Sequence, residues 1–162
     1  MNATDSITVT TLVDVDPETA FTIFTEEIES WWVPRIPRLF RNNGSGRLHF
    51  ETGPNGRLLE TYTSDNVEPF EVGRILTWSP PSRLAFEWRQ GDFAPNERTR
   101  VEVLFEPEGE ATRVTVVHSG WDLLPAKHPS KLGYSGEALR SMLALRWADL
   151  IVAFRAATIG KS

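Results

Sequence analysis

The side chains of this 162-residue sequence that are best suited to chemistry include a histidine at the end of an alternating apolar segment. This is His118, which shares a predicted strand face with Val114 and Val116. Because histidine titrates near neutral pH, His118 could act as a general acid or base. A lone histidine more often satisfies hydrogen bonds at a strand end. Tyr62 is a further polar candidate for the same site.

Arg146 is the second informative residue, because it lies between Met142 and Leu150 within the apolar stripe of the C-terminal segment. A charge in that position must find a partner. Asp149, one turn away, would supply an ion pair, and Arg146 would then have a structural role. Alternatively, its guanidinium points into a cavity and orients a carboxylate or carbonyl group of a ligand. The sequence leaves both interpretations open.

Most other kinds of site lack the residues that they need. There is no cysteine, which excludes disulfides, thiolate catalysis and cysteine-ligated zinc. The histidines His49, His118 and His128 do not have the spacing of metal ligands. Gly44–Gly46 lacks the third glycine of a dinucleotide-binding turn, and no G-x-S-x-G motif surrounds Ser119. We therefore predict no metal, no cofactor and no catalytic residue.

The charge of the chain bounds its partners and location. The formal net charge is −5, so a phosphate backbone or an anionic membrane surface would be repelled. The N-terminal residues do not form a secretory signal, and no apolar run approaches the roughly 20 residues that a membrane helix needs. We expect a cytoplasmic protein that binds neither nucleic acid nor membranes. A homodimer is compatible with the composition.

The elements that must position these residues are read from hydrophobic periodicity. Alternation with a period of two predicts strands that are separated by turn sequences. A helix is predicted to begin at Asp16-Pro17 and to end at Trp31-Trp32, before Pro34. The predicted strands are Ser6–Val15, Arg47–Thr52, Leu58–Thr63, Phe70–Trp78, Leu84–Trp88, Thr99–Phe105 and Arg113–Ser119.

The last segment changes to the three- and four-residue spacing of an amphipathic helix, predicted from Ser135 to Ile159. Strands followed by a long helix indicate an α+β fold, in which the helix packs on one face of an antiparallel sheet. The length of the chain fits one hydrophobic core, so we predict a single domain over residues 1–162.

This order of elements, together with several motifs, resembles the START/Bet v 1-like (SRPBCC) superfamily, and within it the bacterial domains related to the activator of Hsp90 ATPase. The motifs are Trp31-Trp32 before a proline, Gly73-Arg74-Ile75, Pro80-Pro81-Ser82-Arg83-Leu84, Phe86-Glu87-Trp88 and Thr112–Trp121. The resemblance covers nearly the whole chain. It implies a helix-grip fold, a curved antiparallel sheet of about seven strands around a long C-terminal helix.

The six Trp and nine Phe residues either fill a large core or line an apolar cavity. We expect a cavity between the sheet and the C-terminal helix, closed by Trp31-Trp32 and by the loop Gly120–Tyr134, that binds a small apolar or amphipathic ligand. The resemblance also allows a cyclase- or hydrolase-like enzyme, with His118, Arg146 and Tyr62 as polar groups, or a chaperone-interaction module. The predicted ligand-binding residues are Trp32, Phe50, Tyr62, Trp78, Phe86, Trp88, His118, Trp121, Arg146 and Trp147.

Overall fold

The computed structural model describes residues 6–32, 47–62, 68–90 and 93–161. Within these residues the chain forms one antiparallel sheet of seven strands in the order β1-β7-β6-β5-β4-β3-β2. The strands are β1 (Ile7–Val13), β2 (Arg47–Phe50), β3 (Arg57–Thr61), β4 (Phe70–Ser79), β5 (Arg83–Trp88), β6 (Thr99–Glu108) and β7 (Ala111–Ser119). All seven predicted strands are confirmed, with bounds that differ by a few residues.

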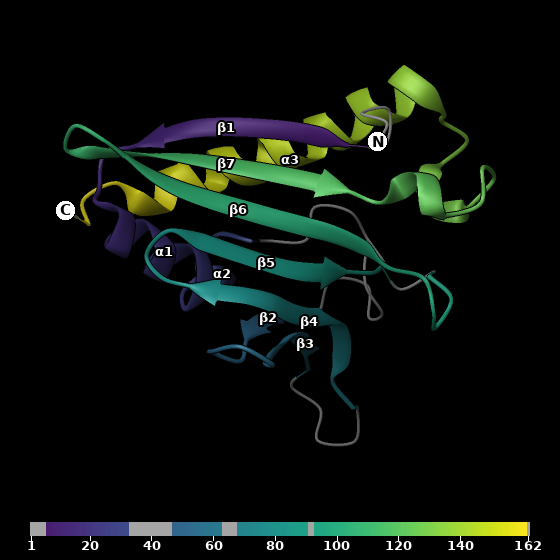
Figure 1. Cartoon of the computed structure of the whole chain (residues 1–162), viewed down its shortest axis with the longest axis horizontal. Helices are drawn as coiled ribbons and strands as arrows, with labels where there is room; N and C mark the ends of the chain where they lie inside the picture. Colours follow the sequence, from purple (N-terminus) through teal and green to yellow (C-terminus); the bar gives the residue numbers. More distant parts are fainter. Residues whose placement is uncertain (1–5, 33–46, 63–67, 91–92, 162) are drawn as a thin grey trace.

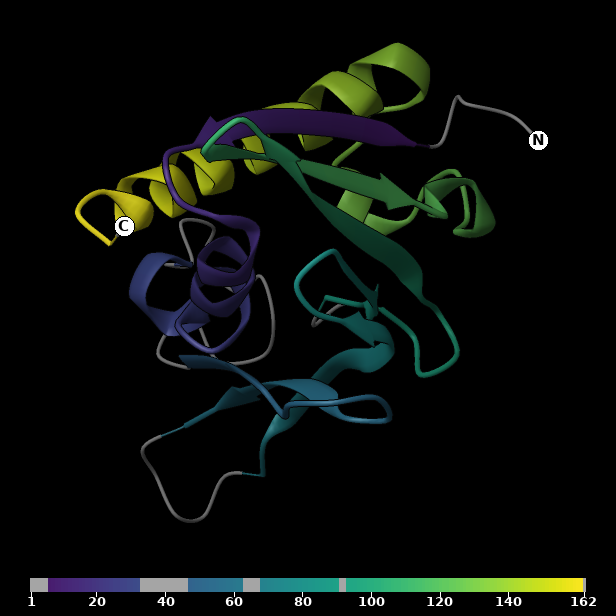
Figure 2. The same cartoon turned by 60° about the vertical axis from the view of Figure 1, so that its left-hand side comes forward.

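The sheet is strongly curved, and the helices lie on one side of it (Figure 1). Figure 2 shows β1 and β7 beside the C-terminal helix at the top, β2 and β3 at the bottom, and the two short helices between them. The predicted α+β helix-grip architecture is therefore confirmed.

The sequence predicts one helix after the first strand, whereas the structure forms two, α1 (Pro17–Thr25) and α2 (Ile28–Trp31). Asp16 caps α1 with its side chain, as the sequence predicts. The turn between the helices brings Trp31 back toward α1, where its indole Nε1 donates to the carbonyl oxygen of Ile23 at 3.0 Å. This contact between successive helices is one that helical periodicity does not reveal.

The C-terminal helix α3 (Gly136–Thr158) confirms the predicted Ser135–Ile159 to within one residue at each end. It lies along β1 and also contacts α1 and α2. A single stripe of α3 is buried, as amphipathic spacing requires. The buried residues are Leu139, Leu143, Trp147, Ile151, Phe154 and Thr158.

The interior between the sheet and the helices is lined by contacting aromatic rings. Near α1, Phe24 packs against Trp31, Phe105 and Phe154 with ring centroids 4.9–5.8 Å apart. Trp31 in turn contacts Trp32 at 5.5 Å, which continues the row of rings toward the opposite end of the sheet. These contacts make the aromatic residues one continuous core.

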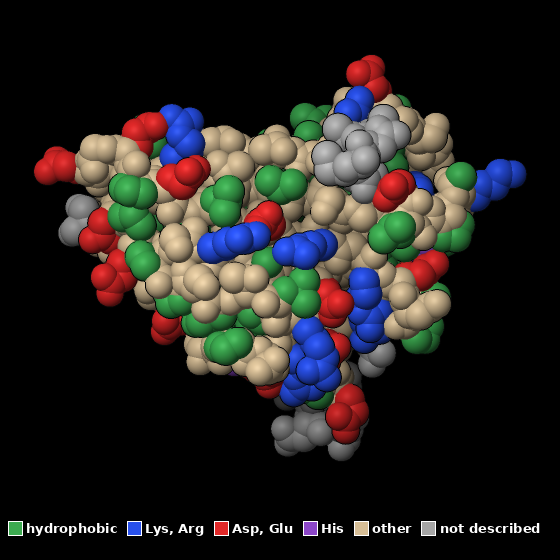
Figure 3. Space-filling view, in the orientation of Figure 1, with side chains coloured by type: hydrophobic (Ala, Val, Ile, Leu, Met, Phe, Trp, Pro, Cys, Tyr) green, Lys and Arg blue, Asp and Glu red, His purple; other side chains and the backbone are tan. Residues whose placement is uncertain are grey.

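The outer face of the sheet is polar and mixed in charge. Figure 3 shows Lys and Arg side chains interspersed with Asp and Glu side chains and with scattered hydrophobic ones. Arg83 on β5 and Glu102 on β6 form an ion pair across this face. Such a surface is a solvated sheet face, and the side chains of interest lie on the inner face.

Candidate ligand-binding site

The larger buried polar side chains of the described residues gather at one end of the sheet. Neighbouring strands are antiparallel, so the last residues of β3, β5 and β7 lie at the same end of the sheet as the first residues of β4 and β6. Here we define the polar end of the sheet as Glu60, Gln90, Thr99 and His118, all of them buried. The buried threonines elsewhere, Thr25, Thr112 and Thr158, each donate to a backbone carbonyl oxygen.

A chain of hydrogen bonds through His118 links the C-terminal helix to three strands. Trp147 Nε1 of α3 donates to His118 Nδ1 at 2.9 Å. His118 Nε2 lies 2.7 Å from Thr99 Oγ1, which donates to the carbonyl oxygen of Trp88 at 3.1 Å. The bonds therefore run from α3 through β7 and β6 to β5.

This arrangement fixes the protonation state of His118. An indole N–H can only donate, so Nδ1 must be unprotonated and Nε2 must carry the proton that bonds to Thr99. The side chain is 2% exposed, and burial lowers the pKa of His118 to about 3. His118 is thus a neutral imidazole at physiological pH with both ring nitrogens engaged, which fits the hydrogen-bonding role and not the acid–base role.

Tryptophan rings surround His118. Trp88 and Trp147 lie with their ring centroids 5.8 and 5.9 Å from the imidazole. Trp32, at the end of α2, stacks on Trp88 at 5.3 Å and meets Trp147 edge-on at 5.4 Å. Five predicted site residues, including Trp121, are therefore brought together at or beside the polar end.

Trp121 differs from the neighbouring tryptophans in its hydrogen bonding. It is 1% exposed and packs against His118 and Phe93, with ring centroids 5.2 and 5.9 Å away. Its indole Nε1 has no hydrogen-bond acceptor among the residues that the structure describes. By contrast, Trp31 and Trp147 donate to Ile23 O and to His118. A buried donor without an acceptor is rare in folded proteins.

Two further predicted residues, Phe50 and Phe86, form the adjoining inner wall with a centroid separation of 5.3 Å. Glu60 lies on this wall, opposite Leu48 in the register of β2 and β3. Its carboxyl group accepts a hydrogen bond from Tyr62 Oη at 2.6 Å. The wall is therefore apolar along its length and carries a carboxyl–phenol pair at the polar end.

Two loops meet over this end of the sheet. Gln90 follows β5 and donates to Ser130 Oγ at 3.4 Å. The Glu97 carboxylate accepts from Ala94 N and is 2.7 Å from His128 Nε2. These bonds lower the pKa of Glu97, with the Ala94 bond as the larger cause. The predicted lid, Gly120–Tyr134, is thus joined to the loop between β5 and β6.

Trp78 lies apart from this cluster, whereas Arg146 directly precedes Trp147 on α3. Trp78 packs edge-on against Phe21 of α1 at 5.2 Å, far along the sheet from the polar end. Arg146 is half-buried beside the buried stripe of α3. On the helix it falls on the flank opposite to Ala144, which faces β1. Arg146 therefore lies on the flank of α3 turned away from β1.

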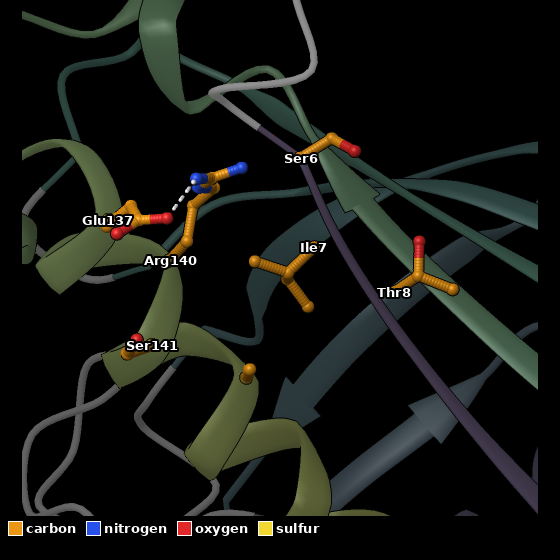
Figure 4. Close-up of a pocket in the computed structure, with 7 residues that line it drawn as sticks. Ser6, Ile7, Thr8, Glu137, Arg140 and Ser141 are labelled. Carbon is orange, nitrogen blue, oxygen red and sulfur yellow. Dashed lines mark hydrogen bonds and ion pairs between the residues drawn. The ribbon is translucent and has the colours of Figure 1, made fainter.

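An open hollow of about 330 Å³ lies outside the predicted site, between the start of β1 and the first turns of α3 (Figure 4). Its lining includes Ile7 and Thr8 of β1, and Glu137 and Arg140 of α3, whose side chains are 3.4 Å apart. None of the predicted ligand-binding residues lines it. We assign the candidate site to the polar end because buried donors and acceptors lie along it.

The sequence did not identify Glu60, Gln90 or Thr99 as site residues. Glu60 had a usable signal, because it falls two residues after Leu58 in an alternating strand and so shares the inner face. Gln90 and Thr99 flank a long loop, and only the folded structure shows that Thr99 bonds to His118 and that Gln90 accepts from Trp88. These positions depend on contacts between distant segments.

Within the described residues, no helix has the length and apolar character to cross a membrane. The same residues contain no group of three or more His, Asp or Glu side chains that could hold a metal ion.

Comparison with solved structures supports the fold. Protein MLL2253 from Mesorhizobium loti superposes with a TM-score of 0.64 at 15% identity, over 93% of this chain and 94% of that one. An HSP90 activator from Plasmodium falciparum, PFC0360w, superposes with a TM-score of 0.61 at 17% identity, over 94% of this chain and 95% of that one. CalU16 from Micromonospora echinospora superposes with a TM-score of 0.60 at 14% identity, over 96% of this chain and 77% of that one. At these identities the likeness concerns the fold alone.

Comparison of sequences identifies the family. No curated protein matches the chain. The model of the family described as activator of Hsp90 ATPase homolog 1-like protein matches residues 14–143, which is most of the sequence and includes the polar end. The chain belongs to the family of activator of Hsp90 ATPase homolog 1-like proteins.

Proposed function

We propose that the chain binds a small amphipathic molecule between the inner face of the sheet and α3, with the oxygen-bearing end of that molecule at the polar end. The observation that carries this proposal is the gathering of buried polar side chains at one end of an otherwise aromatic interior. Ligand sites typically combine an apolar lining with a few convergent polar groups.

Trp121 supplies the donor that such a ligand would use. Its buried indole N–H has no acceptor among the described residues, and leaving a buried donor unsatisfied costs about 1–3 kcal/mol. A carbonyl, hydroxyl or carboxylate oxygen of a bound molecule would remove this cost. The Phe50 and Phe86 wall would contact the apolar part of the same molecule.

Binding fits the arrangement better than acid–base catalysis does. The imidazole of His118 is neutral and holds Thr99 and Trp147. Tyr62 bonds to Glu60 beyond β3, whereas His118 lies on β7, with β6, β5 and β4 between them. A catalytic acid and base would have to converge on one reacting group.

The first experiment is native mass spectrometry of gently purified protein. We expect a co-purifying small molecule, released when the protein is denatured. Calorimetric titration with decanoate and decanol then tests binding directly, since both have an apolar body and an oxygen at one end. Protein that carries no small molecule and binds neither probe would contradict the proposal.

The role of Trp121 is tested with Trp121→Phe, which keeps an aromatic ring and removes the N–H. We expect both probes to bind about threefold to 100-fold more weakly, the range for one hydrogen bond. Trp31→Phe is the matched control, because the Trp31 N–H is already satisfied by Ile23 within the fold. Equal affinities for wild type and Trp121→Phe would remove Trp121 from the site.

A further inference from the structure

Trp32 fills a space between the sheet and α3 beside the polar end. Its ring stacks on Trp88 of β5 with a centroid separation of 5.3 Å and an interplanar angle of 28°, and it meets Trp147 of α3 edge-on at 5.4 Å. Trp88 and Trp147 also contact each other, with ring centroids 6.3 Å apart. We define the Trp32 slot as the space that these two neighbouring indoles bound. In this structure a side chain of the protein itself occupies the slot.

This packing bears on where a ligand can bind, because an occupied space cannot also hold a ligand. The four tryptophans Trp32, Trp88, Trp121 and Trp147 are each at most 4% exposed. Protein interiors packed in this way have few voids larger than a water molecule. A molecule that binds between the sheet and α3 at this end must therefore displace a side chain.

Trp32 is less firmly held than the two indoles beside it. Trp147 donates to His118 Nδ1 at 2.9 Å, and Trp88 donates to Gln90 Oε1 at 3.4 Å. The indole of Trp32 makes ring contacts and no hydrogen bond with the residues that the structure describes. Its departure therefore breaks no hydrogen bond to these residues, and an aromatic ring in its place would restore the ring contacts of Trp88 and Trp147.

Trp32 can leave the slot without a change of the backbone. It caps α2, and its backbone N–H donates to the carbonyl oxygen of Ile28 at 2.9 Å. A different side-chain rotamer keeps this bond and turns the indole outward. Trp121 also has no acceptor among the described residues, but its departure would remove from the site the donor that the ligand uses.

The shape of the displaced side chain defines the class of molecule that fits. The slot holds a flat bicyclic ring, which lies against the face of Trp88 and the edge of Trp147. We propose that Trp32 is a plug of the unliganded protein, and that the ligand is a planar aromatic molecule with one oxygen-bearing end, whose ring takes the place of Trp32. This inference rests on the proposed function and narrows its amphipathic ligand to one chemical class.

Fluorine NMR of protein labelled with 5-fluorotryptophan detects the displacement directly, with 2-naphthol as the probe. The signal of Trp32 is assigned by its loss in Trp32→Phe. On binding, it should acquire the solvent isotope shift of an exposed ring, whereas the signal of Trp147 should stay that of a buried ring. If calorimetry shows that wild type binds 2-naphthol while the signal of Trp32 stays that of a buried ring, the plug is overturned and the proposed function is not.

Calorimetric titration of variants distinguishes a plug from a wall of the site. Trp32→Ala should bind 2-naphthol at least about tenfold more tightly than wild type, because no side chain competes for the slot. Trp78→Ala is the matched control, since it removes an indole that packs against Phe21 far along the sheet. Weaker binding by Trp32→Ala, or equal tightening in both variants, would overturn the plug. Circular dichroism checks that both variants fold.

The ligand class is tested by comparing 2-naphthol with decahydro-2-naphthol, which has the same carbon skeleton and hydroxyl group but is not flat. Wild type should bind 2-naphthol at least about tenfold more tightly, because only a flat ring fits the slot. Equal affinities would overturn the planar class. If neither wild type nor Trp32→Ala binds these alcohols or decanol, the plug and the proposed function fail together.

Discussion

Trp147 Nε1 donates a hydrogen bond to His118 Nδ1 at 2.9 Å, and this bond joins the middle of α3 to the end of β7. Both side chains are buried. The bond holds the imidazole in the tautomer that also donates to Thr99, so the indole of Trp147 sets the tautomer of His118 at the polar end. A protonated His118 would direct an N–H at the N–H of Trp147.

This relationship predicts how stability changes with pH. The pKa of a histidine in an unfolded chain is about 6.5, whereas burial lowers the pKa of folded His118 to about 3. Between these values the unfolded chain binds a proton that the folded protein does not. The free energy of unfolding should therefore fall as pH falls below about 6.5, by about 1.4 kcal/mol per pH unit from this group.

Urea unfolding at pH values between about 7 and 5 measures the effect, because the acidic groups with lowered pKa values titrate mainly below this window. His118→Gln should lower stability at pH 7 and should lose the contribution of His118 to the slope. His49→Gln, which changes an exposed histidine, should keep the slope of wild type. Parallel slopes for wild type and His118→Gln would show that His118 is not the buried neutral group.

Substitutions of Trp147 separate its packing from its hydrogen bond. Trp147→Ala should lower the free energy of unfolding by about 3–5 kcal/mol through cavity formation. Trp147→Phe keeps a ring but leaves His118 Nδ1 without its donor, which should cost about 1–3 kcal/mol. Leu123→Ala, at an exposed position, should change stability by no more than about 0.5 kcal/mol. The measurement is urea unfolding followed by circular dichroism. If the Trp147 variants lost no more stability than Leu123→Ala, Trp147 would lie at the surface.

The sequence was sufficient for the architecture because periodicity reports which face of each element is buried. The burial of Trp147 and the inner position of Phe86 follow directly from spacings of three to four and of two residues. His118 could be placed on the inner face of its strand for the same reason. Its partners could not be predicted, because Thr99 and Trp147 reach it from other elements.

Irregularities of the sheet were also beyond the sequence pattern. The register between β3 and β4 shifts at Leu58/Leu59, and Gly73 lies so close to β5 that an added Cβ would collide with the backbone oxygen of Glu87. A bulge of this kind changes which residues face inward. The glycine is visible in the sequence, but the strand that approaches it is a property of the folded sheet.

The loops over the polar end should open together. Glu97 accepts from Ala94 N in its own loop and from His128 in the other, so Glu97→Ala removes both bonds. We expect amide hydrogen exchange at Ala94 and at Ser130, which donates to His128 Nδ1, to become about tenfold faster. Exchange within β6 and β7 should stay unchanged.

Glu106→Ala is the control for the loop experiment, because Glu106 is exposed on β6 away from these loops. It should leave exchange at Ala94 and Ser130 as in wild type. Faster exchange at Ala94 alone would show that the two loops open independently, and it would contradict the coupling through Glu97 and His128.

Arg146 provides the last prediction, which concerns the polarity of the ligand. It lies half-buried on the flank of α3 turned away from β1, directly before Trp147. Arginine presents several fixed donors and stays charged at all relevant pH values. If Arg146 contacts the ligand, anionic molecules should be favoured over neutral molecules of the same length.

Arg146→Met keeps much of the side-chain length and removes the charge. Decanoate should bind more weakly by about 1–3 kcal/mol, the range for a charge-assisted hydrogen bond, whereas decanol should bind about as well as to wild type. Arg155→Met, on the exposed face of the same helix, should leave both affinities unchanged. Calorimetric titration of the three proteins with both probes measures these affinities. Equal losses for decanoate and decanol in Arg146→Met would assign Arg146 to a structural ion pair, and its role in ligand selection would be abandoned.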